Sequence, residues 1–159
     1  MLNKQLLIEL QEYVERNLNF LTYSMMESNE KHSIGLEDFI KNKRQPTFNQ
    51  TLFKLIDKKG TADTEIYKKA GLDRRHFSKI RSNPEYRPRK NTVVALALAL
   101  ELNKKETDKL LSSAGYSLSD SDTFDLVIQF CLEKKIYNVH DVNQALDYFS
   151  LKPFMGVLD

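Results

Sequence analysis

The chain has 159 residues, of which 41% are hydrophobic, and its net charge is only +2. This length and composition suit one sizeable core, or one small core with an appended helical lobe, and exclude two large independent domains. The longest apolar stretch, residues 93–100, is far shorter than the roughly 18 to 20 residues that cross a bilayer. The first residues lack the apolar run of a secretion signal, and the single cysteine, Cys131, cannot form an internal disulfide. We therefore expect a cytoplasmic protein with no membrane partner.

Positive charge is concentrated in one segment. Residues 68–90 contain nine lysines and arginines against two acids, a net charge of +7, so the rest of the chain sums to −5. Such a concentration raises the local potential and attracts polyanions. The alternative is a solvated basic face that has no partner.

The N-terminal part predicts one long helix and a linker. From residue 2 to about residue 23, leucines and a valine recur at three- and four-residue spacing with polar residues between them, which indicates an amphipathic helix. Residues 29–34 show no clear period. A short apolar cluster follows at residues 36–40, before Pro46. We expect a linker with one short helix.

After Pro46 the sequence predicts helices separated by capping and terminating residues. Thr47 caps a first helix that Gly60 ends, and Thr61 or Asp63 opens a second that stops at Gly71. The third helix, residues 74–81, is capped by Asp73 and has only Phe77 and Ile80 for a core stripe. The predicted core residues of these three helices are Phe48, Leu52, Leu55, Ile56, Ile66, Ala70, Phe77 and Ile80.

A loop with two prolines leads to two further helices. Asn91 or Thr92 is expected to cap a central core helix at residues 93–102, which is apolar on most sides. Asn103 and Glu106 have the spacing of a capping box for a helix at residues 104–113, and this helix closes at Gly115.

Two more amphipathic helices are predicted in residues 117–159. This C-terminal lobe has seven acids and three lysines, a net charge of −4, and is an unlikely DNA surface. The expected organisation is therefore an all-α chain of three parts. Residues 1–46 form the N-terminal helix and linker, residues 47–116 a five-helix domain, and residues 117–159 a two-helix lobe.

The stretch EIYKKAGLDRRHFSKIRS, followed by NTVVALALALELNKKETDKLLSSAGYSL, resembles the lambda-repressor-like, XRE-type helix-turn-helix family. The resemblance rests on Ile66, Ala70, Gly71 and Leu72 at the turn, Phe77 and Ile80 on the buried side of the recognition helix, and Leu96, Ala97 and Leu100 behind them. It also extends to the helix-turn-helix modules that accompany macrodomain-type proteins in some bacteria. The resemblance implies a lambda-repressor-like core and a DNA-binding transcriptional regulator or accessory protein that acts on duplex DNA.

Two positions depart from the family pattern. Tyr67, four residues before Gly71, replaces a small residue, which predicts that the two helices splay or that the turn shifts. Asp63 stands where a glutamine commonly contacts a phosphate, and its charge would be repelled by DNA. Both departures favour the alternative function, a protein-interaction adaptor of antitoxin or defence type that keeps the fold without reading DNA, with Tyr67 exposed beside arginines.

In the family the third helix enters the major groove, where its N-terminal residues contact bases while flanking cations contact phosphates. An arginine paired with guanine contributes about 1–3 kcal/mol of discrimination. The resemblance thus implies that the base-reading residues are Arg74, Arg75 and Ser78 and that the phosphate contacts are Arg81, Arg87, Arg89 and Lys90. Lys79 suits either use, and His76 is either a DNA contact or a bystander.

Enzyme and metal chemistry are not indicated. His32, His76 and His140 are widely separated, Cys131 has no adjacent ligand, and no phosphate-binding glycine loop occurs. Asp120 and Asp122 lie at a helix start, where capping explains them. We expect no catalytic residue, no metal and no cofactor.

The leucine-rich stripe of the N-terminal helix must be buried against something. One option is a homodimer, which would present two recognition helices to half-sites about 34 Å apart. The other is packing against the C-terminal helices of the same chain. The stripe consists of Leu7, Leu10, Val14, Leu18 and Leu21, with Asn17 at an inward position.

Overall fold

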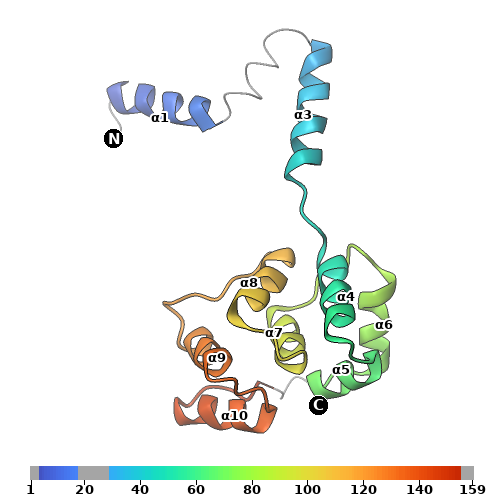
Figure 1. Cartoon of the computed structure of the whole chain (residues 1–159). Helices are drawn as coiled ribbons and strands as arrows, with labels where there is room; N and C mark the ends of the chain where they lie inside the picture. Colours follow the sequence, from blue (N-terminus) through green and yellow to red (C-terminus); the bar gives the residue numbers. More distant parts are fainter. Residues whose placement is uncertain (1–3, 18–28, 155–159) are drawn as a thin grey trace. The chain divides into compact units, whose positions relative to one another are not determined.

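A computed structural model of the chain describes residues 4–17 and 29–154 (Figure 1). Over these residues the secondary structure consists of helices and contains no strand, which confirms the all-α prediction. The chain divides into two compact units, residues 1–45 and residues 46–159. Within the described part, no helix is both long and apolar enough to span a membrane.

The first unit contains α1, Lys4–Asn17, and α3, Asn29–Lys43. Residues 18–23 of the predicted N-terminal helix, with Leu18 and Leu21, lie outside the described residues. The helix expected in the linker is present but longer than predicted, because α3 begins at Asn29 and runs through Gly35. Residues 29–34 lack an apolar period but include Glu30 and Lys31, which are good helix formers, so propensity favours a helix that periodicity does not reveal.

The second unit opens with α4, Phe48–Lys59, α5, Asp63–Ala70, and α6, Arg74–Ser82. Thr47 and Gln50 form a capping box at the start of α4, where each side chain accepts a hydrogen bond from the other's backbone N–H. Gly60 ends α4 in the left-handed conformation, as predicted. The second helix begins at Asp63 without a side-chain cap, since the N-cap residue is Ala62.

The centre of this unit is α7, Lys90–Ala99, followed by α8, Lys104–Ser113. All residues from Thr92 to Leu100 are buried, which confirms that this helix is the central core helix. It begins earlier than predicted, because Arg89 is the N-cap residue and Thr92 is buried within the first turn instead of preceding it. Asn103 and Glu106 form the predicted capping box.

The C-terminal lobe consists of α9, Thr123–Glu133, and α10, Val139–Tyr148. Asp122 and Asn138 cap the two helices through their side chains. Their inner faces join the core of α4–α8, so the second unit has one continuous hydrophobic core. The inner residues are Val127, Ile128, Cys131, Leu132, Val142 and Leu146, and Phe154 closes this end of the core.

Candidate nucleic-acid interface

The turn between α5 and α6 is fixed by backbone hydrogen bonds and one cap. Gly71 has a φ of 71° and donates its N–H to the carbonyls of Lys68 and Tyr67, while the N–H of Leu72 donates to Tyr67 at 2.8 Å. Asp73 then caps α6 by accepting a hydrogen bond from the N–H of His76 at 2.6 Å. Because Gly71 tolerates this left-handed conformation and Asp73 starts the next helix at once, the direction of α6 is set locally.

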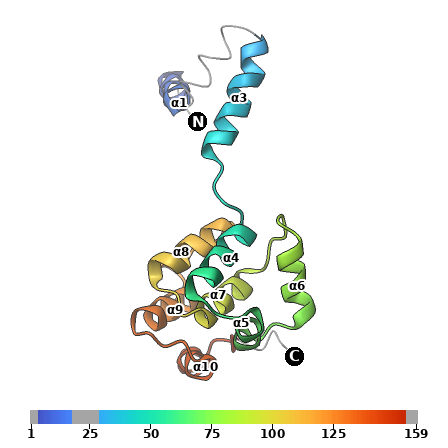
Figure 2. The same cartoon turned by 45° about the vertical axis from the view of Figure 1, so that its right-hand side comes forward.

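One side of α6 is anchored in the core. Phe77 and Ile80 are buried, as predicted, and the Phe77 ring packs edge-on against Phe53 of α4 with ring centroids 5.9 Å apart. The side-chain amide of Asn49 in α4 donates to the carbonyls of Ile80 and Arg81 at the end of α6. These contacts hold α6 at the edge of the second unit, with α4 and α5 on its inner side (Figure 2).

The opposite side of α6 presents free positive charge. Arg74, Arg75 and Lys79 are exposed and have no ion-pair partner among the residues that the structure describes. Arg89, just before α7, is exposed and unpaired in the same sense, and Ser78 is exposed between the α6 cations. The hydrogen-bonding groups of these side chains are therefore available for a ligand.

Three other predicted contacts already have partners within the chain. Arg81 pairs with Asp63, and its guanidinium lies 4.4 Å from the centroid of the Phe53 ring. The Arg87 Nε donates to the carbonyl of Ala114 at 2.8 Å. These side chains stabilise the packing of α6 and of the loop that follows it.

Lys90, the third of these predicted contacts, joins the basic segment to the C-terminal lobe. The Lys90 Nζ lies 2.7 Å from the carboxylate of Asp125, which is buried in α9. The same carboxylate oxygen accepts a hydrogen bond from the N–H of Ser119 at 2.8 Å. Lys90 thus compensates a buried negative charge, and sequence inspection missed this role because the two residues are 35 positions apart.

His76 connects α6 to the loop before α7. Its Nε2 lies 3.1 Å from the hydroxyl of Tyr86, and the two rings meet edge to face. The ring is half-buried by this contact. The structure therefore gives His76 a packing partner in the loop before α7.

The two departures from the family pattern have local explanations. Tyr67 is half-buried against Phe77, with ring centroids 5.6 Å apart, and is not the exposed tyrosine that the adaptor hypothesis assumed. Gly71 ends α5, as the sequence predicted. The carboxylate of Asp63 is balanced by Arg81.

A cleft of about 910 Å³ lies between the end of α5, the start of α6 and the start of α7. Its lining combines the cations of Lys68, Arg89 and Lys90 with the rings of His76 and Tyr86. Two of its cations were predicted as phosphate contacts, whereas the participation of Tyr86 could not be read from the sequence.

No group of His, Cys, Asp or Glu side chains in the described part of the chain is arranged to hold a metal ion. Comparison with known protein families, with curated proteins and with solved structures finds no match to this chain. The assignment of function therefore rests on the residues and their geometry.

Proposed function

We propose that this chain is a DNA-binding protein, a transcriptional regulator or an accessory protein of that kind. In this proposal α4–α8 form a lambda-repressor-like core, α5 and α6 are its helix-turn-helix, and α6 is the recognition helix. The observation that carries the proposal is the outer side of α6, where Arg74, Arg75 and Lys79 are exposed and unpaired while Phe77 and Ile80 fix the inner side.

The contacts divide by position. Arg74, Arg75 and Ser78, near the N-terminus of α6, are proposed to reach base edges in the major groove, because a recognition helix enters the groove by that end. Lys79, Arg89 and Lys68, an exposed lysine that lines the same cleft as Arg89, are proposed to contact phosphates. Arg81, Arg87 and Lys90 contribute less than the sequence suggested, because DNA would have to compete with Asp63, Ala114 and Asp125 for them.

Charge reversal on α6 tests the proposal. The double variant Arg74→Glu with Arg75→Glu changes the charge by −4 at two exposed positions outside the core stripe. We expect loss of duplex binding in fluorescence anisotropy, with helical content and unfolding midpoint close to those of the native chain. Unchanged DNA affinity in this variant would exclude α6 as the recognition helix.

A matched control is available on α8. Lys105→Glu with Lys109→Glu makes the same charge change at two exposed positions, and α8 and α6 lie on opposite sides of the second unit in both views (Figures 1 and 2). The control should retain most of the affinity, because long-range effects on exposed charges are screened beyond about 10 Å at 0.1 M salt. Equal losses in the two variants would mean that net charge, and not the α6 surface, drives binding.

A further inference from the structure

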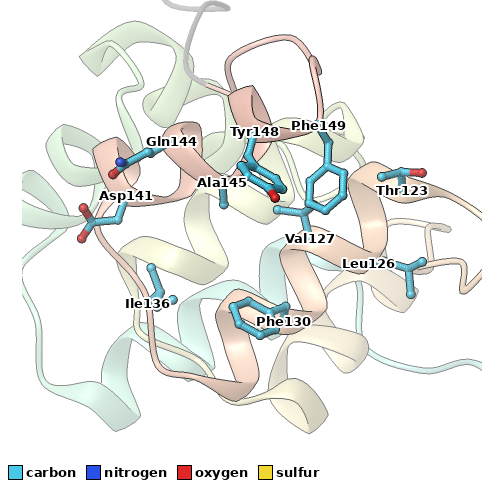
Figure 3. A pocket seen from close by; sticks show the side chains of 10 residues that line it. All are labelled: Thr123, Leu126, Val127, Phe130, Ile136, Asp141, Gln144, Ala145, Tyr148 and Phe149. Atoms are coloured by element: carbon cyan, nitrogen blue, oxygen red, sulfur yellow. The ribbon is translucent and has the colours of Figure 1, made fainter.

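The C-terminal lobe has an open apolar groove of about 720 Å³ between α9 and α10 (Figure 3). Phe130 forms one wall, and Tyr148 and Phe149 form the opposite wall, while Asp141 and Gln144 lie together at one end. Phe130 is 53% exposed and Tyr148 is 83% exposed. The Tyr148 and Phe149 rings meet edge to face, with their centroids 5.2 Å apart.

The apolar side chains of this groove are not needed for the core. Helix α9 buries Ile128, Cys131 and Leu132 on its inner side and carries Leu126 and Phe130, both about half exposed, on the other. A helix that is apolar on two sides needs two partners, and the described residues of the second unit supply only the inner one. A contiguous apolar surface of this kind marks an interaction site.

The length of the groove suits a helix. Its lining runs along α9 from Thr123 to Phe130, and a rise of about 1.5 Å per residue places these two residues roughly 10 Å apart along the helix. The first and last anchors of a helix that presents apolar residues at positions i, i+3 or i+4, and i+7 are separated by the same distance.

The charge around the groove indicates which charge a helix bound there would carry. Asp141 is the one charged side chain among the lining residues that the structure describes, and the lobe of residues 117–159 has a net charge of −4. The Nζ of Lys134 lies 6.0 Å from the centroid of the Phe130 ring, so the negative charge of the groove is located at Asp141, away from this ring. Two surfaces of a second copy are poor occupants, because another lobe would bring a charge of −4 and the helix of residues 4–17 has two cations and three acids, a net charge of −1.

We propose that the groove between α9 and α10 binds an amphipathic helix of a protein partner, whose apolar face enters the groove and whose polar face carries lysine or arginine. The anchors of this helix pack against Phe130, Tyr148 and Phe149, and one of its cations pairs with Asp141. The surface is separate from α6, so this interaction does not depend on DNA binding.

The test uses two synthetic probes with the full chain. Both are 18-residue helical peptides with leucines at the same positions, and the remaining positions are mainly lysine in one and mainly glutamate in the other. We expect the leucine–lysine peptide to bind in fluorescence anisotropy and the leucine–glutamate peptide to bind at least about tenfold more weakly, since like-charge repulsion opposes it.

Two variants localise the binding. Leu126→Ala with Phe130→Ala should weaken the leucine–lysine peptide by at least about tenfold, because buried aromatic anchors dominate such contacts. Asp141→Asn should weaken the binding of the leucine–lysine peptide less than the double variant does. It should also reduce the difference in affinity between the two peptides. Phe39→Ala is the matched control, since Phe39 is an exposed phenylalanine of α3, outside the lobe. Duplex affinity should stay unchanged in the groove variants.

Four results would overturn the proposal. These are no binding of the leucine–lysine peptide, equal binding of the two peptides, undiminished binding to the Leu126→Ala, Phe130→Ala variant, and self-association of the native chain that this variant abolishes. The last result would show that the groove is an interface between copies.

Discussion

The ion pair between Lys90 and Asp125 joins one buried and one partly exposed side chain, so we expect the two single substitutions to lower the free energy of unfolding by different amounts. The side chain of Asp125 is 2% exposed, whereas that of Lys90 is 29% exposed. Lys90→Ala leaves a buried carboxylate without its cation, and removing one partner of a buried pair costs about 3–5 kcal/mol. Asp125→Ala leaves an ammonium group that can reach water and removes the hydrogen bond from the Ser119 N–H to a charged acceptor, which contributes about 1.5–3 kcal/mol.

We therefore expect Lys90→Ala to lower the free energy of unfolding by about 2 kcal/mol more than Asp125→Ala. The free energy of unfolding of the double variant, Lys90→Ala with Asp125→Ala, should be close to that of Asp125→Ala alone, because the double variant no longer contains the unpaired buried carboxylate. Urea unfolding followed by circular dichroism measures all three, and an unchanged slope with denaturant confirms that the transitions are comparable. If Asp125→Ala lowered the free energy of unfolding as much as Lys90→Ala or more, the different burial of the two side chains would not explain their contributions to stability.

Three further predictions concern separate sites. Burial tends to raise the pKa of Glu106, but the Asn103 N–H, Lys59 and Lys58 lower it below its ordinary value, so its stabilising effect is lost as the pH falls through that lowered pKa. Glu106→Gln should therefore flatten the acid side of the stability profile in urea titrations between pH 5 and pH 2, and an unchanged acid slope would contradict this. If the leucine stripe of the N-terminal helix packs between two copies of the chain, Leu7→Ser with Leu10→Ser should convert the dimer to a monomer in sedimentation equilibrium, whereas a monomeric native chain at micromolar concentration would refute the dimer. Burial, and then the charge of Asp141, raise the pKa of the Cys131 thiol, so Ellman's reagent should react with the native chain far more slowly than with the urea-unfolded chain, and equal rates would show that the thiol is accessible.

The sequence predicted the features that depend on neighbouring residues. Thr47, Asp73 and Asn103 cap their helices as expected, because a cap joins residues only three positions apart. Gly60 and Gly71 end theirs in the left-handed conformation that glycine adopts without strain. The start of α7 was misplaced, because Thr92 is a good capping residue whose burial in the core only the tertiary structure reveals.

The features that were missed depend on residues far apart in the chain. The charge run from residue 68 to residue 90 looks uniform in the sequence, yet Arg81, Arg87 and Lys90 are held by groups of α5, the end of α8 and α9. The groove was also missed, because Leu126 and Phe130 have the spacing of ordinary core residues and only packing shows that they lie outside it. The sequence therefore located the basic surface without separating the available cations from the structural ones.

We propose that the free cations on and beside α6 bind the phosphates and bases of duplex DNA. Lys68, Arg74, Arg75, Lys79 and Arg89 are exposed and unpaired among the residues that the structure describes. Each phosphate contact contributes about −0.9 to the slope of log affinity against log salt, so the expected slope per chain is about −4.5 if all five contact phosphates and about −2.7 if Arg74 and Arg75 read bases instead. The decisive measurement is fluorescence anisotropy of the full chain with a random duplex over a range of salt concentrations. A slope between these two values supports DNA binding by these cations. An absence of binding at low salt, or an affinity that salt does not change, contradicts it.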